Sequence, residues 1–353
     1  MIIMKPERVV LVVTDGRDYS IKEVSEWLLF YSMKENFQII VLDVSRNGLV
    51  LKNGIISDDS DLLMGISDTD IEFNLNSLIG IFFRQTSLRI VFHSGVTSNS
   101  GASTDIKSRV HNYLMAYEAN IRYFILNCFS EKNIIGYDSG SFINKLDVLK
   151  AANEVGINTP ATMLIGNKKD LQAFHAEHTE IIVKSAALNL EFFDLENKLH
   201  FRQLTHAISE NDYSNIPDAF QLSLVQKKIS KEFEIRTFYL DGECYSWALL
   251  SQSNDKTTVD YRNYDLDKPM RVVPFKLPNP EERHIKYLMK KLQLRTGSID
   301  LIYSTNKEYI FLEVNPAGQY GYNAVSVNDN IDKKLAEALI FTNDKKKHRT
   351  RHS

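Results

Sequence analysis

Residues 298–315 read SIDLIYSTNKEYIFLEVN, two mainly apolar segments around a polar turn. SIDLIYS and YIFLEVN have the composition of two β-strands, and the residues between them can close a hairpin. A hairpin centred between Asn306 and Lys307 would place Asp300 opposite Glu313. Directly opposed carboxylates destabilise a sheet unless something offsets their charge. This pairing raises the question of what offsets the charge of the two acids.

An amide follows the two acids on the same face. Asn315 lies two residues after Glu313, and alternate residues of a strand project from the same side. Two carboxylates and an amide oxygen are ligands that Mg²⁺ takes, leaving other positions to water and substrate phosphates. We also expect Ile302 and Phe311 on this face, where partial burial makes unpaired charge costly. The alternative is that the acids lie on a solvated face and bind no metal.

Length and composition indicate a globular protein of two or three domains. The chain has 353 residues, 43% of them hydrophobic, and a net charge of −3. This charge gives no reason to expect nucleic acid as a partner. Two cysteines, Cys128 and Cys244, cannot form a disulfide framework. No apolar run approaches the length of a membrane span, so we expect a cytoplasmic protein without a membrane partner.

The first part of the chain is typical of an α/β domain. Residues 8–44 predict a buried strand, a helix with Ser20 as its N-cap and a second strand. The glycine-rich fingerprint of dinucleotide-binding folds is absent from this opening. Further elements expected here are a strand over 78–88, a helix over about 105–120 and a strand over 122–127.

The rest of the chain is richer in strands. A helix is predicted from about residue 143, with Gly156 at its left-handed cap and Pro160 beginning an extended exit. Asp241-Gly242 predicts a tight hairpin turn. Other expected elements are a strand at 179–185, a hairpin at 189–205, strands from about residue 206, and helices at 280–294 and 329–341.

Several phrases together resemble one family. NKLDVLKAA, FEIRTFYLDG, VDYRNYD, TGSIDLI and FLEVNPAGQYG are similar to ATP-grasp ligases, particularly the graspetide peptide maturases encoded with SPASM-domain proteins. The resemblance covers nearly the whole chain. It implies an α/β ATP-grasp fold with a pre-ATP-grasp domain at 1–130, a central domain at 131–205 and a C-terminal ATP-grasp domain at 206–341. The tail, 342–353, has five Lys or Arg and is expected to be a solvated end.

The resemblance implies which residues bind ATP. Lys145 and Lys184 match the two lysines that hold the phosphates, although solvated lysines would look the same in sequence. Glu234 matches the acid that contacts the ribose, for which a surface ion pair with Arg236 is the alternative. The hinge that binds adenine in this family is matched by four consecutive residues, Gln226, Lys227, Lys228 and Ile229. They depart from the usual pattern at the second residue, Lys227.

Residues near the reacting phosphate are implied in the same way. Arg236 matches the arginine near the transferred phosphate, and Arg262 with Asn263 resembles the element that meets the phosphate and acylphosphate. Asp300, Glu313 and Asn315 match the residues that bind Mg²⁺. The implied cofactors are therefore ATP and Mg²⁺, whose positive charge offsets that of the leaving phosphoryl group.

The implied substrate is a ribosomally synthesised precursor peptide with a leader and a core. An Asp or Glu side chain of the peptide becomes an acylphosphate, and a Ser, Thr or Lys of the same peptide displaces phosphate to close a macrocycle. The resemblance also favours a homodimer and a SPASM protein as a pathway partner. Residues 191–204 could contact the leader or simply pack the central domain through Phe192, Phe193, His200, Phe201 and Arg202.

Other residues remain open between binding and structure. Arg84 resembles an N-terminal-domain arginine of these ligases but could be an ordinary arginine at a strand end. Residues 318–323 could form a mobile loop over the acceptor, or Tyr320 and Tyr322 could be packing residues. The competing functions are an ATP-grasp ligase that adds a free amino acid, and a non-catalytic nucleotide- or peptide-binding module.

Overall fold

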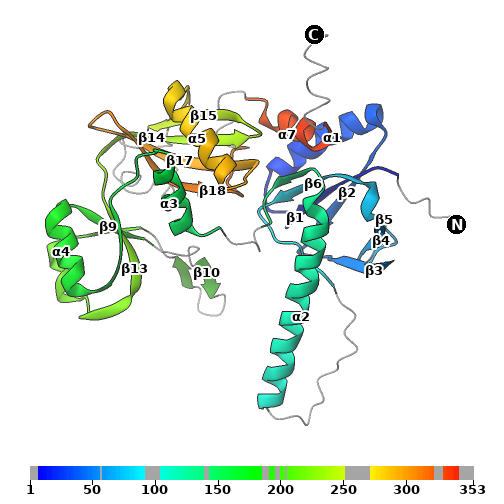
Figure 1. Cartoon of the computed structure of the whole chain (residues 1–353), viewed down its shortest axis with the longest axis horizontal. Helices are drawn as coiled ribbons and strands as arrows, with labels where there is room; N and C mark the ends of the chain where they lie inside the picture. The colour runs from blue at the N-terminus through cyan, green and yellow to red at the C-terminus, as the bar shows by residue number, and fades with distance from the viewer. Residues whose placement is uncertain are drawn as a thin grey trace. The chain divides into compact units, whose positions relative to one another are not determined.

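The computed structural model describes two compact units (Figure 1). The first comprises Met1–Phe142 with Asp329–Ser353, and the second comprises Ile143–Asn328. Within them the structure describes residues 7–55, 58–91, 104–138, 143–184, 191–194, 199–202, 205–250, 271–321 and 329–341.

The first unit is built on a parallel sheet with strand order β2-β1-β6-β7. Helix α1 (Ser20–Glu35) connects the first two strands, which confirms the predicted opening; its N-cap is Tyr19, and the predicted cap Ser20 is its first residue. All six residues of β1 are buried, as expected for a parallel strand covered on both faces. The strands are β1 (Val9–Thr14), β2 (Gln38–Asp43), β6 (Leu78–Arg84) and β7 (Ile134–Gly136).

Two layers cover this sheet. On one face, Leu11 and Val13 share a core with Ile125 and Phe129 of helix α2 (Thr104–Ser130). An antiparallel sheet extends this core, with strands β3 (Leu49–Ile55), β4 (Asp58–Ile66) and β5 (Glu72–Asn74), followed by the short helix η1 (Leu75–Ser77). The second layer is formed by α1 and α7 (Ile331–Ile340), which pack against each other.

A glycine permits the close packing of α7 on the sheet. A Cβ added at Gly80 would lie 2.4 Å from the Leu339 carbonyl oxygen, so any larger residue would push the helix away. Asn133 further fixes α7, since its amide donates to the carbonyls of Ala338 and Leu339 at 2.7 Å each. The predicted division assigned residues 329–341 to the C-terminal domain, whereas this helix packs within the first unit.

The strand predicted at 122–127 is wrong, because these residues lie inside α2. Their aromatic and β-branched composition favours a strand, but the apolar residues that face the core are spaced as on a helix. Ile121, Phe124 and Cys128 pack partly buried against the same core as Ile125. Tertiary packing of one helix face therefore outweighs the local propensity.

The second unit contains a sheet of order β12-β9-β13-β8. Its core lies on one face, where Ile165, Ile181 and Val225 pack against Leu171 and Phe174 of helix α4 (Lys168–His178). The predicted cap is confirmed, since Gly156 has φ +83° after helix α3 (Lys145–Glu154). Elements of this part are β8 (Thr162–Asn167), β9 (Ile181–Lys184), β12 (His206–Ile208), η2 (Glu210–Ser214), β13 (Ala219–Lys227) and the hairpin of β10 (Glu191–Asp194) with β11 (Leu199–Arg202).

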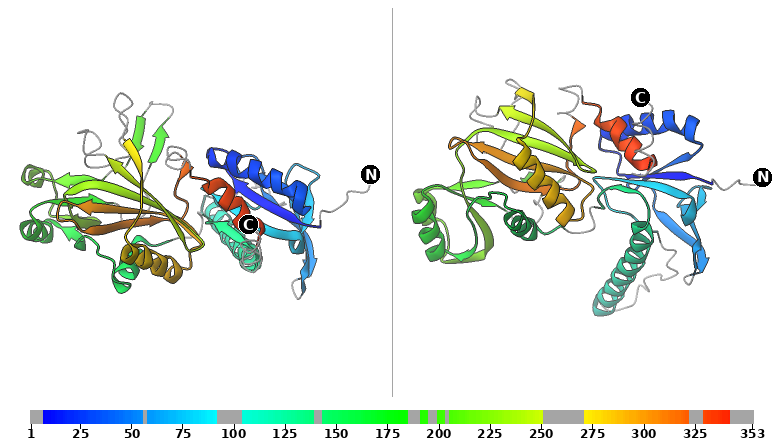
Figure 2. Two further views of the ribbon diagram at one scale, coloured as in Figure 1. Left: turned by 90° about the horizontal axis from the view of Figure 1, so that it is seen from above. Right: turned by 45° about the horizontal axis from the view of Figure 1, so that its top comes forward.

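The same unit contains a five-stranded antiparallel sheet of order β16-β15-β14-β17-β18, seen in two further views in Figure 2. The predicted turn between β14 and β15 is confirmed, with positive φ at Asp241 and Gly242. Its elements are β14 (Lys231–Leu240), β15 (Glu243–Leu250), β16 (Arg271–Phe275), helix α5 (Asn279–Lys291), β17 (Thr296–Ser304) and β18 (Tyr309–Asn315). Within the described ranges, no helix is long and apolar enough to cross a membrane.

The hairpin of β17 and β18 contains an irregularity that the sequence did not reveal. Asp300 faces Glu313 as predicted, but Leu301 faces Phe311, so β18 has one extra residue between the two pairs. The expectation that Phe311 shares the face of Asp300 is wrong, because Phe311 pairs with Leu301 on the opposite face. Near the turn, Tyr303 faces Tyr309, which is one residue out of the predicted register. The extra residue of the bulge shifts β18 by one position, so that Glu313 nevertheless faces Asp300.

Candidate functional site

Charged side chains form a row across three adjacent strands of the five-stranded sheet. Arg236 on β14 faces Asp300 on β17, which in turn faces Glu313 on β18. Directly opposed residues of antiparallel strands project from the same face, so all three lie together. The Nη1 atom of Arg236 lies 2.7 Å and 2.8 Å from the two carboxylate oxygens of Asp300. Only 11% of the arginine side chain and 13% of the aspartate side chain are exposed, which strengthens their attraction.

Lys145 extends this row from a helix. Asn144 caps α3 by accepting a hydrogen bond from the Leu146 amide at 2.8 Å, which fixes the start of the helix at Lys145. Helix α3 packs along β18, and the Lys145 ammonium lies 3.9 Å from Glu313. The row therefore carries two cations at its ends and two carboxylates between them. We call Lys145, Glu313, Asp300 and Arg236 the charged row.

Glu234 lies two residues before Arg236 and therefore on the same face of β14. Its carboxylate pairs with Lys231, and both side chains are buried. Sequence reasoning missed Lys231, although a lysine close to an acid in the same strand was visible in KEFEIR. The proposed ribose-binding acid thus already has a cationic neighbour that can hold it in place.

Asn315 is fixed by the turn that follows β18. Its side-chain oxygen accepts a hydrogen bond from the Ala317 amide at 3.1 Å, and its carbonyl accepts from the Gly318 amide at 3.0 Å. Ser298, which faces Asn315 across the ladder, donates to the Gln319 carbonyl at 3.2 Å. A Cβ added at Gly318 would lie 2.4 Å from that of Ser298, so the turn requires a glycine there.

These residues fit a magnesium ion. Asp300 and Glu313 offer carboxylate oxygens from facing positions, and Asn315 offers an amide oxygen beside Glu313. No cluster of three His, Cys, Asp or Glu side chains suited to a metal occurs in the described part of the chain. A set of two carboxylates and one amide suits Mg²⁺, which completes its coordination with water and phosphate oxygens. It suits zinc poorly, because zinc prefers nitrogen and sulfur ligands.

The predicted nucleotide residues of the central sheet lie on one face of it. Lys184 faces Leu224 on β13, and Ile182 faces Gln226, so Lys184 and Gln226 project from the same side. This side is opposite to the one that packs against α4. Gln226 is buried and donates to the Thr162 hydroxyl at 2.9 Å, while its Oε1 accepts no hydrogen bond from the described residues. That oxygen is an acceptor available for a ligand donor.

The hinge after Gln226 is held by its own chain. The Lys227 amide donates to the Ala161 carbonyl, and the Lys228 amide donates to the Glu180 carbonyl, each at 2.9 Å. The Lys228 ammonium also contacts the Glu180 carboxylate at 2.7 Å. These contacts fix the backbone of the hinge while the Lys227 side chain is exposed. The backbone of this predicted hinge is therefore hydrogen-bonded within its own chain, and the departure at Lys227 concerns a side chain rather than the backbone.

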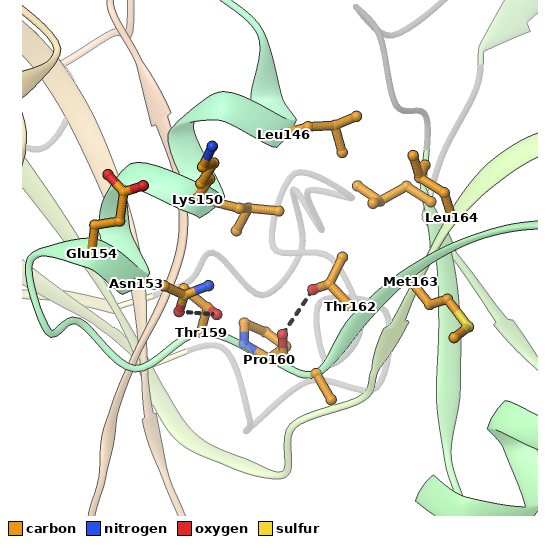
Figure 3. A pocket seen from close by; sticks show the side chains of 12 residues that line it. Leu146, Lys150, Asn153, Glu154, Thr159, Pro160, Thr162, Met163 and Leu164 are labelled. Carbon is orange, nitrogen blue, oxygen red and sulfur yellow. Dashed lines mark hydrogen bonds between the residues drawn. The ribbon is translucent and has the colours of Figure 1, made fainter.

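Two cavities border this region. One, of about 550 Å³, lies between α3 and the sheet, and Figure 3 shows Leu146 and Lys150 of the helix with Thr162 and Leu164 of β8 around it. Two hydrogen bonds hold residues that line this cavity (Figure 3). The Thr159 hydroxyl donates to the side-chain oxygen of Asn153 at 2.8 Å, and the Thr162 hydroxyl donates to the Pro160 carbonyl at 2.7 Å. The other, of about 530 Å³, is lined by hinge residues Lys227 and Ile229.

Some predicted residues are not brought into this geometry. Arg262, Asn263 and Tyr322 lie outside the described residues. The backbone of β10 and β11 is described, but the side chains of the predicted leader contacts are not; these are Phe192, Phe193, His200, Phe201 and Arg202. Arg84 belongs to the first unit, where its guanidinium pairs with Asp18 at 2.8 Å. Tyr320 is buried, and its ring packs 4.6 Å from that of Phe238. The packing interpretation is therefore confirmed for Tyr320.

Solved structures similar to this one identify the fold of the chain, whereas comparisons of sequence do not. No known family model matches the chain, and no curated protein is similar in sequence. The structure is similar to macrocyclase MdnC of Microcystis aeruginosa MRC bound with precursor peptide MdnA, with a TM-score of 0.68, 21% identity, and coverage of 94% of this chain and 99% of that one.

Two further solved structures agree. A RiPP-associated ATP-grasp ligase of Chryseobacterium gregarium, in complex with ADP and a leader and core peptide, has a TM-score of 0.69, 20% identity, and coverage of 94% and 96%. ATP-grasp ligase PsnB, complexed with a phosphomimetic variant of its minimal precursor, Mg and ADP, has a TM-score of 0.64, 15% identity, and coverage of 95% and 99%. This chain therefore has the ATP-grasp fold along nearly its whole length.

Proposed function

We propose that this protein is an ATP-dependent, ADP-forming peptide ligase that macrocyclises a ribosomally made precursor peptide. The observation that carries this proposal is the charged row, where a pair of carboxylates suited to Mg²⁺ lies between Lys145 and Arg236 on one sheet face. The similar structures include ligases complexed with precursor peptides, ADP and Mg, which supports the same substrate classes here.

The nucleotide is assigned to the side of the central sheet that α4 does not cover. In the proposal, Lys184 and Lys145 contact the phosphates as point charges, and Glu234 contacts the ribose hydroxyls. Hinge residues hold the adenine mainly through their backbone. Mg²⁺, held by Asp300, Glu313 and Asn315, would offset negative charge on the phosphates.

The reaction proposed has two balanced steps. A carboxylate oxygen of a precursor Asp or Glu attacks the γ-phosphorus of ATP, which breaks the bond to the β-phosphate oxygen and gives an acylphosphate and ADP. A Ser, Thr or Lys side chain of the same peptide then attacks the acyl carbon and forms an ester or amide. Inorganic phosphate leaves, and the proton of the attacking hydroxyl or amine passes to this phosphate or to water. Arg236 and Arg262 are assigned to stabilising the charge that develops during phosphoryl transfer. No nucleophilic residue of the enzyme is needed.

The proposed setting is a cytoplasmic homodimer. Cys128 and Cys244 are both free thiols, which is consistent with a reducing compartment. A SPASM-domain protein is the proposed pathway partner, since the sequence resembles maturases encoded beside such proteins. The three-domain division, with boundaries near residues 130 and 205, is also a proposal, and the pairing of β13 with β8 and β9 supports moving the second boundary beyond Lys227.

The deciding experiment measures the intact mass of a precursor peptide after incubation with the protein, ATP and Mg²⁺. Loss of one water per bond together with ADP release is the expected result. A mass gain equal to an amino-acid residue would instead support a free amino-acid ligase. No mass change and no ADP release would overturn the enzyme proposal in favour of a binding module.

Glu313→Gln tests the site itself. We expect the variant to fold but to lose Mg²⁺-dependent turnover, because its amide cannot replace a carboxylate charge at the metal. Glu243→Gln is the matched control, since Glu243 is an exposed acid at the far turn of the same sheet and should leave turnover unchanged. Normal cyclisation by Glu313→Gln would refute the metal assignment.

A further inference from the structure

Strand β14 contains an extra residue near its start. Lys231 faces Ser304 of β17. Phe233, two residues further on, faces Tyr303, so two steps along β14 match a single step along β17. The extra residue of this bulge is Glu232. Such a bulge changes which face of the sheet the residues before it occupy relative to those after it.

The bulge brings Lys231 onto the face of Glu234. In a regular strand, residues that are three apart project from opposite faces. Here they face Ser304 and Ile302, which are two apart on β17 and therefore share a face. Lys231 and Glu234 thus lie on one face of β14, and the lysine ammonium pairs with Oε1 of the glutamate.

Glu234 has apolar neighbours on both sides of it in the sheet. It faces Leu249 on β15 and Ile302 on β17, which are 2% and 8% exposed. The side chains of Lys231 and Glu234 are themselves only 8% and 9% exposed. A carboxylate charge in such surroundings is costly unless a cation offsets it. The ammonium of Lys231 therefore stabilises the ionised form of Glu234 in this place.

We propose that Lys231 is a positioning residue, which holds the ionised Glu234 carboxylate ready to accept hydrogen bonds from the ribose hydroxyls of the nucleotide. This inference rests on the ribose contact of the proposed function and names the residue on which that contact depends. An ionised carboxylate only accepts hydrogen bonds, and a charged hydrogen bond is roughly twice as strong as a neutral one. Lys231 thereby sets the preference for a nucleotide with a 2′-hydroxyl. Arg236, further along the same face, is engaged by Asp300 instead.

Calorimetry with ADP and 2′-deoxy-ADP in the presence of Mg²⁺ tests this dependence. We expect the wild type to prefer ADP by about tenfold, which corresponds to one charged hydrogen bond. Lys231→Met should remove most of this preference by weakening the binding of ADP. Lys231→Arg should retain most of it, because a guanidinium keeps the positive charge. A wild-type preference in folded Lys231→Met would overturn the inference. If Lys231→Met does not fold, Lys231→Gln replaces it, since it keeps a polar side chain without the charge.

A double-mutant cycle shows whether Lys231 acts through Glu234. Glu234→Leu removes the carboxylate and suits its apolar neighbours, so it should abolish the preference for ADP. Adding Lys231→Met to Glu234→Leu should weaken ADP binding no further, because the lysine then has no carboxylate to hold. A further loss of affinity, equal to that of Lys231→Met alone, would show that the lysine acts independently of Glu234 and would overturn the positioning role.

Lys307→Met is the matched control. Lys307 pairs with Glu232, the extra residue of the same bulge, but these two side chains are 63% and 35% exposed. The variant should bind both nucleotides like the wild type, and a loss of preference equal to that of Lys231→Met would overturn the inference. A wild type that binds neither nucleotide would overturn the ATP site of the proposed function as well. A wild type that prefers ADP, together with a Lys231→Met variant that keeps this preference, would overturn the role of Lys231 alone.

Discussion

Arg236 and Asp300 face each other on adjacent strands, and one guanidinium nitrogen lies within 2.8 Å of both carboxylate oxygens. The same guanidinium reaches the Gln319 carbonyl at 3.4 Å through its other terminal nitrogen. An arginine assigned to phosphoryl transfer is thus held by a carboxylate assigned to the metal. In the charged row, Asp300 lies beside Arg236 and Glu313 lies beside Lys145. In the proposed complex, the two acids would bind Mg²⁺ in place of these cations, and the two cations would contact the nucleotide phosphates in place of the acids.

Removing the Asp300 carboxylate should destabilise the fold as well as abolish turnover. Asp300→Asn removes the carboxylate charge that pairs with the mostly buried Arg236 guanidinium. We expect a loss of about 1–3 kcal/mol in the free energy of unfolding, measured by urea denaturation. Arg236→Met combined with Asp300→Asn should recover part of this loss, since no unpaired charge then remains. Strictly additive effects of the two changes would contradict the pairing.

Lys145→Gln should affect metal and nucleotide in opposite directions. Removing the ammonium that lies 3.9 Å from Glu313 should tighten nucleotide-free binding of Mn²⁺, used as a paramagnetic substitute for Mg²⁺. The same change should weaken ADP binding several-fold, because one phosphate contact of the proposed site is lost. Electron paramagnetic resonance measures the first quantity and calorimetry the second.

Lys168→Gln is the control for this experiment. Lys168 forms a pair of similar length, 3.8 Å from Asp218, on the α4 side of the same unit. Its replacement should leave both affinities unchanged. If Lys145→Gln also changed neither affinity, Lys145 would be an ordinary solvated lysine rather than a member of the site.

Gly318→Ala should disturb the turn that holds Asn315. The added methyl group would approach the Cβ of Ser298 to 2.4 Å and its hydroxyl oxygen to 2.5 Å, so the turn would have to shift. We expect a loss of about 1–3 kcal/mol in unfolding free energy and weaker Mg²⁺ binding in the presence of ADP. Ser298→Gly added to Gly318→Ala should restore part of both, because it removes the clashing atoms. No effect of Gly318→Ala would show that the turn can relax freely.

Much of the fold was predictable where the pattern is local. The β1-α1-β2 opening and the Asp241-Gly242 hairpin follow from apolar periodicity and turn chemistry, which depend on neighbours in sequence. The ion pair of Arg236 with Asp300 is different, because it depends on the pairing of β14 with β17, strands that are distant in sequence. Nothing in the composition of either strand determines which strands become neighbours.

The Asp300–Glu313 pair shows how a correct prediction can rest on incomplete reasoning. Turn symmetry predicted the pairing, yet Tyr303 faces Tyr309 in a register offset by one, and a bulge restores the predicted partner. A bulge leaves no distinct signature in a short apolar strand. The placement of residues 122–127 failed for a related reason, since packing against a distant core selects a helix that local propensity does not favour.

Cys244 should resist thiol reagents in the folded protein. Burial raises the pKa of its thiol to about 12, and the negative charge of Glu282 acts in the same direction. Because only the thiolate reacts, labelling at pH 8 should be slower than for an ordinary thiol by a factor of about 10³. The rate should rise with pH well beyond 9, since the thiolate fraction keeps increasing up to the raised pKa.

Iodoacetamide labelling followed by peptide mapping measures Cys244 and Cys128 separately, with the urea-unfolded protein as the control for full reactivity. Rapid labelling of Cys244 at pH 8 in the folded protein would show that the thiol is accessible and ionised, contrary to the raised pKa of this β15 residue.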